Sequence, residues 1–221
     1  MAETVQTFPD AATSDPVALG WMVGSPPPPD RVIRWSDFSS YGFPQLRWSF
    51  SHTRELVPTR NISRGLGAPL PLPRAERDDL DAVRFTVTGT DESMTWGESL
   101  VENYVDGVVI LHRGRIVQER YFGALRPEGQ HIAMSVTKSL VGTIGAMMVA
   151  EGTLDPDALV TTYVPELAGS GFGDATVRQV LDMTTGVQFS EDYEDREAEI
   201  LAHAFAGSIL PRPADWTGPQ S

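Results

Sequence analysis

The chain has 221 residues, and its 30 acidic side chains against 17 basic ones give a formal net charge of −13. This excess of negative charge argues against nucleic acid and other polyanions as partners. The chain contains no cysteine, which excludes a disulfide framework and a thiolate metal site, and its four histidines show no paired ligand spacing. We therefore expect no metal and no other cofactor.

The first 20 residues contain no basic segment followed by an apolar run, so the sequence predicts a cytoplasmic location without a secretory signal. The most apolar stretch, residues 140–150, is about half as long as the roughly 20 residues of a membrane span. We interpret this stretch as a buried helix and expect no association with a membrane.

Residues 1–104 are predicted to form an irregular, proline-rich N-terminal extension. They contain the runs GSPPPPD and APLPLPR, together with isolated aromatic side chains. Consecutive prolines favour polyproline II and exclude helix, while scattered aromatics suit a segment that lies over another surface. A domain with clearer patterning is expected to occupy residues 105–221.

The patterning of residues 105–221 predicts a β-hairpin followed by helices. Two β-rich runs, residues 107–111 and 115–122, are joined at a turn that contains Gly114. An apolar helix is expected to begin at or just before Ser135 and to end at Gly152. A short helix within residues 174–186 follows, with Asp174 as N-cap and Gly186 as C-cap, and then an acidic loop and a further possible helix.

Lys138 is the only lysine in the chain, and it lies three residues after Ser135 at the start of the predicted helix. Residues three apart share a face of a helix, so the two side chains are expected to be neighbours. Unlike arginine, lysine can lose its proton when it is desolvated or placed beside positive charge. The positive end of the helix dipole and burial would both favour this loss, and N–H groups at the helix start could stabilise an oxyanion. The pair thus has the pattern of a serine nucleophile with a lysine base.

A structural alternative for this pair is a surface lysine beside an N-capping serine. The local pattern alone leaves both interpretations open.

Longer motifs around the pair add a resemblance to a known family. The segments SVTKS, GTLDPDALVTTYVPEL, VRQVLDMTTGV and SEDYED resemble the β-lactamase-related serine hydrolases, which include class C β-lactamases, penicillin-binding carboxypeptidases and family VIII esterases. Within this superfamily, YVPELAGS and EDY look most like the nylon-oligomer (aminohexanoate-dimer) hydrolase group. The resemblance covers about residues 105–205.

The resemblance implies an α+β fold, with an antiparallel sheet flanked by helices and a helical subdomain. It also implies a serine hydrolase that cleaves a small ester or amide through an acyl-enzyme, with Ser135 matching the nucleophile and Lys138 the general base. Tyr193 matches a loop tyrosine that contacts substrate in the nylon-oligomer group, although a surface aromatic without that role fits equally well. Alternatives are a D-alanyl carboxypeptidase or β-lactamase activity, or a non-catalytic binding protein.

The sequence departs from the superfamily pattern after Ser135. Neither a Tyr-x-Asn/Ser motif nor a Lys/His-Thr/Ser-Gly strand follows that serine, and both are expected to lie beyond Ser221. The chain is therefore expected to be the N-terminal part of a domain whose C-terminal half is missing. We expect such a fragment to be nearly inactive and to leave the edges of its hairpin unpaired.

Overall fold

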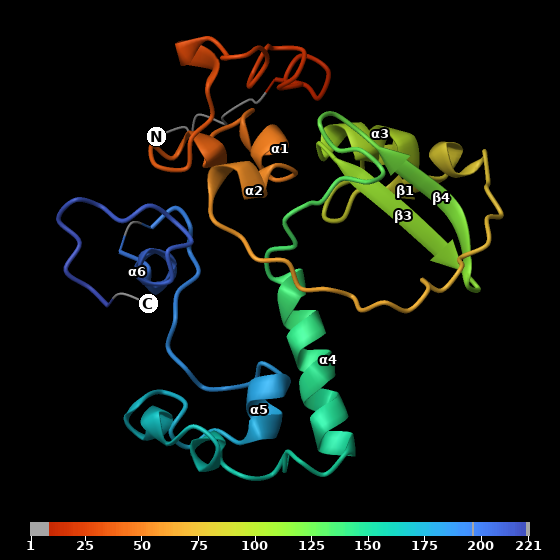
Figure 1. The fold of residues 1–221 in the computed structure, drawn as a ribbon. Helices are drawn as coiled ribbons and strands as arrows, with labels where there is room; N and C mark the ends of the chain where they lie inside the picture. Colours follow the sequence, from red (N-terminus) through yellow and green to blue (C-terminus); the bar gives the residue numbers. More distant parts are fainter. Residues whose placement is uncertain (1–8, 196, 220–221) are drawn as a thin grey trace. The chain divides into compact units, whose positions relative to one another are not determined.

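The structure is a computed structural model that describes residues 9–195 and 197–219 (Figure 1). It divides into two compact units, one up to Ile132 and one from Ala133 onward. Residues 1–8 of the predicted extension lie outside the described residues. Helices occur together with two small antiparallel sheets, which confirms the predicted mixture of α and β structure. The predicted boundary between residues 104 and 105 stays a prediction.

The first unit begins with short helical turns, one of which carries a buried arginine. Arg47 is 4% exposed, and its guanidinium group donates to the carbonyl of Ala11 and to Ser14 Oγ, both at 2.8 Å. The same group lies over the ring of Tyr104, 5.4 Å from the centroid. Arg47 therefore joins the N-terminal turns to the residues that precede the hairpin. These turns are η1 Pro29–Arg31, η2 Ser39–Tyr41, α1 Leu46–Ser49 and α2 Thr53–Leu56.

Residues 80–102 are more regular than the sequence led us to expect. They form the 3₁₀ turn η3 Leu80–Ala82, strands β1 Arg84–Thr86 and β2 Ser93–Thr95, and helix α3 Trp96–Glu102. Thr95 caps α3, because its hydroxyl accepts from the Glu98 N–H while Glu98 accepts from the Thr95 N–H. This reciprocal arrangement is a capping box, which satisfies two N–H groups at the start of a helix.

The predicted hairpin is confirmed as β3 Gly107–His112 and β4 Arg115–Tyr121. Arg113 and Gly114, between the strands, both have positive φ, at 51° and 75°. Positive φ at both central residues defines the type I′ turn, whose twist matches that of the flanking strands.

An extended segment of the proline-rich region, residues 73–77, pairs alongside β4. The N–H of Ile116 donates to the carbonyl of Pro73 at 3.0 Å. The N–H groups of Ala75 and Arg77 donate to the carbonyls of Ile116 and Val117, at 2.8 and 3.0 Å. Arg74 and Ile116 form a parallel bridge. The expectation that both edges of the hairpin stay unpaired is thus wrong for β4, because the extension provides a partner strand far away in the sequence.

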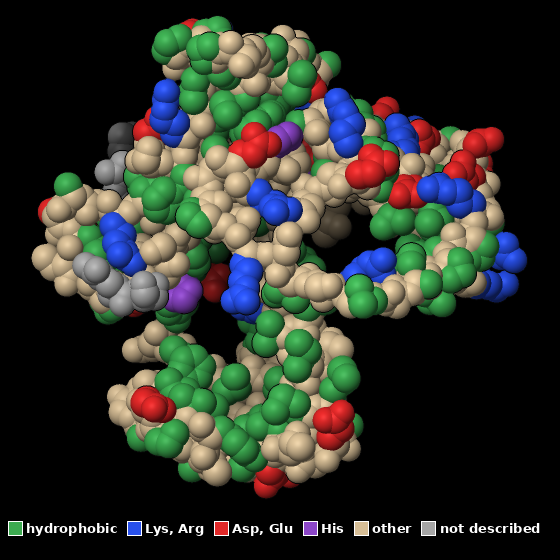
Figure 2. All heavy atoms as spheres, in the orientation of Figure 1, with side chains coloured by type: hydrophobic (Ala, Val, Ile, Leu, Met, Phe, Trp, Pro, Cys, Tyr) green, Lys and Arg blue, Asp and Glu red, His purple; other side chains and the backbone are tan. Residues whose placement is uncertain are grey.

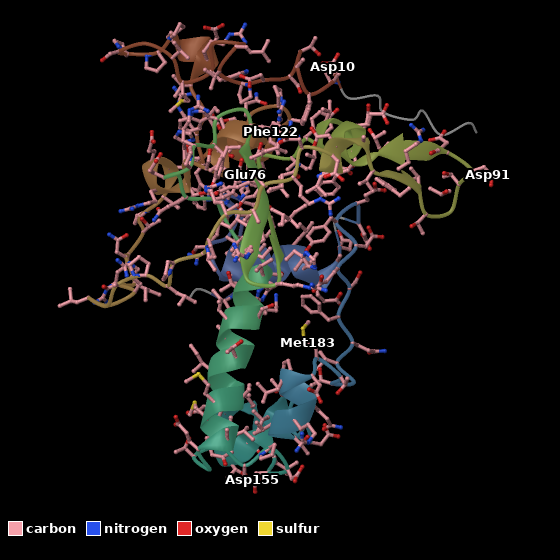
Figure 3. The ribbon with its side chains drawn as sticks, turned by 90° about the vertical axis from the view of Figure 1, so that its right-hand side faces the viewer. Asp10, Glu76, Asp91, Phe122, Asp155 and Met183 are labelled. Atoms are coloured by element: carbon pink, nitrogen blue, oxygen red, sulfur yellow. The ribbon has the colours of Figure 1, made fainter. Side chains whose placement is uncertain are left out.

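The second unit begins with α4 Val136–Ala150, the longest helix in the described part of the chain (Figure 1). Ser135 occupies the N-cap position, within one residue of the predicted start, and Gly152 follows the C-terminal end with φ 75°, a left-handed conformation that glycine adopts without steric cost. Figure 3 labels Asp155, which lies beyond that end. Both predicted ends of this helix are confirmed.

The interpretation of α4 as a buried helix is wrong for the described chain. None of its residues is buried, and its large apolar side chains are 40–67% exposed. The apolar side chains are Val136, Leu140, Val141, Ile144, Met147 and Met148. Figure 2 shows hydrophobic side chains on the surface of this unit. The expectation failed because burial needs a second surface, which the amphipathic pattern of one helix does not specify.

After α4 the chain makes short turns and two more helices. The 3₁₀ turns are η4 Val160–Thr162 and η5 Pro165–Gly169, and the helices are α5 Val177–Leu181 and α6 Glu199–Ala206. The N-cap of α5 is Thr176, not the predicted Asp174, because Thr176 forms a capping box with Gln179. Its C-cap is Asp182, not Gly186. In the described part of the chain no helix has the length and apolar character needed to span a membrane.

Candidate active site

The side chains of Ser135 and Lys138 meet at the start of α4. Lys138 Nζ donates to Ser135 Oγ across 2.9 Å. Ser135 has φ −69° and ψ −11°, which is already helical geometry, and its hydroxyl caps no backbone N–H group. The hydroxyl is therefore engaged with the lysine rather than with the helix end, unlike the capping serine of the structural alternative.

The backbone around this pair is tightly turned. Met134, the preceding residue, has φ 45°, a left-handed value that is uncommon for a residue with a side chain. The N–H groups of Val136, Thr137 and Lys138 donate to the carbonyls three residues earlier at 2.9–3.1 Å. These three amides are therefore occupied, contrary to the expectation that they are free to stabilise an oxyanion.

Ser135 and Lys138 are both exposed to solvent, so the burial expected for the lysine is absent from the described chain. Among residues 9–195 and 197–219, no carboxylate forms a salt bridge with Lys138. Such a partner would stabilise the charged form of a lysine and oppose a role as base. In the described part of the chain, the ammonium group of Lys138 donates a hydrogen bond to the serine hydroxyl.

Tyr193, the third residue singled out from the sequence, lies in the acidic loop before α6 and is 71% exposed. The loop is fixed at its start, where the Ser190 N–H donates to Glu199 Oε2 at 2.9 Å. This hydrogen bond lowers the pKa of the Glu199 carboxyl. Asp192 Oδ1 accepts from the Glu194 N–H at 3.0 Å and so closes a local turn. In the described part of the chain, no hydrogen bond or ring contact joins Tyr193 to Ser135 or Lys138.

A second polar pair, in the first unit, was not found from the sequence. His131 Nε2 lies 3.1 Å from Asp106 Oδ2, and the two residues are 25 positions apart, too far for any local motif to signal the contact. Burial raises the pKa of the Asp106 carboxyl, although the hydrogen bond with His131 acts in the opposite direction. His131 also borders a surface pocket of about 400 Å³ that includes Phe50 and Arg54.

Comparisons with known proteins show which family this chain resembles. The model of the family described as Beta-lactamase matches residues 98–217, which include the whole of α4. The 6-aminohexanoate-dimer hydrolase of Paenarthrobacter ureafaciens is 36% identical over 160 residues. A solved structure from Bacillus anthracis, described as a candidate 6-aminohexanoate-dimer hydrolase, has a TM-score of 0.70 and 26% sequence identity with this chain.

The two relatives are longer than this chain. The first match covers 72% of this chain and 38% of the Paenarthrobacter protein, and the second covers 87% of this chain and 49% of the Bacillus one. The predicted α+β fold of β-lactamase type is confirmed by these matches. Because the family model matches more than half of the residues of this chain, the chain belongs to the Beta-lactamase family.

Proposed function

We propose that the protein is a serine hydrolase that cleaves a small ester or amide through an acyl-enzyme on Ser135. The observation that carries this proposal is the 2.9 Å contact between Lys138 Nζ and Ser135 Oγ, made by a serine that caps no helix N–H. A serine hydroxyl is a weak nucleophile until a neighbouring group accepts its proton. Lys138, once deprotonated, is placed to accept it.

The reaction begins when Ser135 Oγ attacks the carbonyl carbon of the substrate. The hydroxyl proton passes to the neutral amine of Lys138, and the carbonyl π electrons move onto oxygen to form a tetrahedral oxyanion. The oxyanion collapses, the bond to the leaving alcohol or amine breaks, and the leaving group takes the proton. Water then attacks the acyl-serine with the same proton transfers, which releases the carboxylic acid and restores Ser135.

One backbone amide at this helix start suits the oxyanion. The N–H groups of the next three residues are occupied by turn hydrogen bonds, whereas no hydrogen bond recorded in the described chain uses the Ser135 N–H. Removing one oxyanion donor typically slows hydrolysis by roughly 10²–10³-fold. We therefore assign the Ser135 N–H as one oxyanion donor.

The names of the two relatives support a small substrate. Both are described by the hydrolysis of a 6-aminohexanoate dimer, and we extend to this protein only the size and the ester or amide class of the bond. Tyr193, which is exposed in the acidic loop, is proposed as a residue that contacts this substrate.

The test is covalent labelling by a fluorophosphonate probe, read as an increase in intact mass. Wild type and Ser139→Ala should each gain one probe, whereas Ser135→Ala should gain none. Ser139 is the matched control, because it lies one turn further along the same helix and is also exposed. Equal labelling of Ser135→Ala, or no labelling of the wild type, would contradict the proposal.

A further inference from the structure

Met134, the residue before the proposed nucleophile, has the backbone conformation of a glycine position. Its φ is 45°, and Ser135 follows with φ −69° and ψ −11°. The N–H of Val136 donates to the carbonyl of Ala133 at 3.0 Å and so closes a turn of four residues. A positive φ followed by these angles is the pattern of a type II′ turn, whose first central residue is preferably glycine. A methionine therefore occupies a turn position that favours glycine.

Other left-handed residues of the described chain have a conventional structural cause. Tyr104, Met183 and Ser208 each lie two positions after the last residue of a helix, and each N–H donates to the carbonyl three residues earlier. This is the Schellman arrangement, in which a left-handed residue ends a helix. Arg113 belongs to the turn of the hairpin. Met134 instead precedes a helix, where no end-of-helix motif calls for a positive φ.

Burial of the methionine side chain gives little reason for this conformation. Met134 is 45% exposed, so packing has a weak hold on it. A backbone in a sparsely populated conformation costs free energy, and such residues gather at active sites, where the conformation is part of the mechanism. The residue that follows this one is the proposed nucleophile.

The left-handed residue also marks the point where the hydrogen bonds of the helix begin. The N–H groups of Val136, Thr137 and Lys138 each donate to the carbonyl three residues earlier. This series stops at Ser135, because no hydrogen bond recorded in the described chain uses its N–H. The positive φ of Met134 turns the preceding chain away from the helical path, so the carbonyl that would continue the series is not in place.

We propose that Met134 is a positioning residue, whose left-handed backbone keeps the Ser135 N–H outside the helical hydrogen bonds and free for the oxyanion. This inference rests on the proposed function. When Ser135 Oγ attacks a carbonyl carbon, negative charge develops on the carbonyl oxygen, and the nucleophile's own N–H is a known type of oxyanion donor. A donor that is already free needs no reorganisation at the moment of reaction. The Met134 side chain touches no reacting atom in this account.

The experiment compares residues that differ in their tolerance of a positive φ at position 134 of the intact protein. Met134→Gly and Met134→Asn accept the left-handed conformation, whereas the β-branched side chain in Met134→Val resists it. With an activated ester, kcat of Met134→Val should fall by at least about tenfold while KM changes less. The glycine and asparagine variants should stay within about threefold of the wild type. Because glycine has no side chain, its activity separates a role of the backbone from a role of the methionine side chain.

Met183 offers a matched control. It is a methionine with φ 54° in the same unit, just after the end of α5 (Figure 3). Met183→Val places the same valine in the same kind of backbone, so both valine variants should unfold at a lower temperature than the wild type. Only Met134→Val should lose kcat, because only that residue adjoins Ser135. An equal fall of kcat in both variants would show that a general loss of stability slows the reaction, which would contradict the proposal.

Amide hydrogen exchange tests the geometry without turnover. In the wild type, the Ser135 N–H should exchange at least about tenfold faster than the Thr137 N–H, relative to their intrinsic rates, because only the second is hydrogen-bonded. In Met134→Val this difference should shrink, since a right-handed backbone would continue the helical path towards the Ser135 N–H. Strong protection of the Ser135 N–H in the wild type would overturn the proposal.

Two kinetic outcomes would also overturn it. One is full kcat in a folded Met134→Val, and the other is a loss of kcat in Met134→Gly as large as that in Met134→Val. If Met134→Val does not fold, the glycine variant and the exchange of the wild-type Ser135 N–H make the decision. If the wild type shows no turnover, the proposed function fails, and the exchange contrast still decides whether this amide is free.

Discussion

Leu181 of α5 lies against the backbone of Gly145 in α4, so closely that a Cβ atom added at Gly145 would be 2.8 Å from Leu181 Cδ2. Gly142, one turn earlier in the same helix, has no such neighbour within 4 Å in the described chain. The absence of a side chain at Gly145 is thus what allows α5 to approach α4.

This contrast predicts different effects for the same substitution. Gly142→Ala should raise the free energy of unfolding by up to about 1 kcal/mol, because alanine favours helix. Gly145→Ala has the same intrinsic gain but must displace Leu181, so its net stabilisation should be smaller or reversed. Urea denaturation of both variants measures the difference in their free energies of unfolding. Equal midpoints would show that Leu181 moves aside without loss of stability.

Lys138→Arg should abolish most of the turnover while keeping the fold. Arginine preserves the positive charge but stays protonated, so it cannot accept the Ser135 proton. We expect kcat to fall by roughly 100-fold or more, the loss typical of a positioned base. Arg178→Lys, an exposed exchange of the same two residue types in α5, is the control and should retain activity. Full activity of Lys138→Arg would exclude Lys138 as the base.

Removing the cap of α3 should destabilise the first unit. Thr95→Ala deletes the hydroxyl that accepts from the Glu98 N–H at 3.1 Å, which should cost about 1 kcal/mol of unfolding free energy. Thr86→Ala, at an exposed position of β1 that caps no helix, is the control and should cost less. Thermal denaturation of the two variants makes the comparison, and an equal loss would contradict the role of the cap.

The same cap predicts a dependence on pH. The N–H of Thr95 and then its hydroxyl hold the pKa of the Glu98 carboxyl below its ordinary value. A lowered pKa in the folded state stabilises the protein above the ordinary value, and this contribution is lost as the pH falls through the lowered one. The stability difference between wild type and Glu98→Gln should therefore shrink on acidification. A constant difference from pH 7 to pH 3 would disprove the linkage.

A polypeptide limited to residues 1–221 should expose apolar surface and hydrolyse activated esters barely above background. Its α4 has no buried residue, and the buried apolar side chains in the described part of the second unit are small, namely Ala175, Val177, Ala198 and Ala204. Strong binding of the dye ANS and a broad thermal transition are the expected observations. A sharp, cooperative transition together with saturable turnover that depends on Ser135 would contradict this expectation.

Features fixed by neighbouring residues were predictable from the sequence. The hairpin could be located because alternating β-rich runs flank a turn with Gly114, and α4 because its apolar period ends at Gly152. The closeness of Ser135 and Lys138 follows from a spacing of three on a helix. Their roles in catalysis stay predictions, as does that of Tyr193.

Features formed between distant residues were missed. The Asp106–His131 pair is separated by the whole hairpin, so no spacing rule signals it. The cap of α5 was misplaced for a different reason, since Asp174 and Thr176 are both capping residue types. The pattern Thr-x-x-Gln, which forms the capping box here, would have selected Thr176.

The parallel pairing of residues 73–77 with β4 sets an order of events during synthesis. The two strands of the hairpin are close neighbours in the chain and can pair soon after synthesis. Pro73, in contrast, can pair only after Ile116 has been synthesised, about forty residues later. At the usual elongation rate of about 5–20 residues per second, this wait lasts about 2–8 s. The segment that precedes Pro73 contains Leu70, which is 82% exposed. During this interval the segment is not held by the hydrogen bonds that residues 73–77 form with β4. A translational pause between codons 77 and 116 would prolong the exposure of that segment, whereas a pause well after the hairpin has emerged would not.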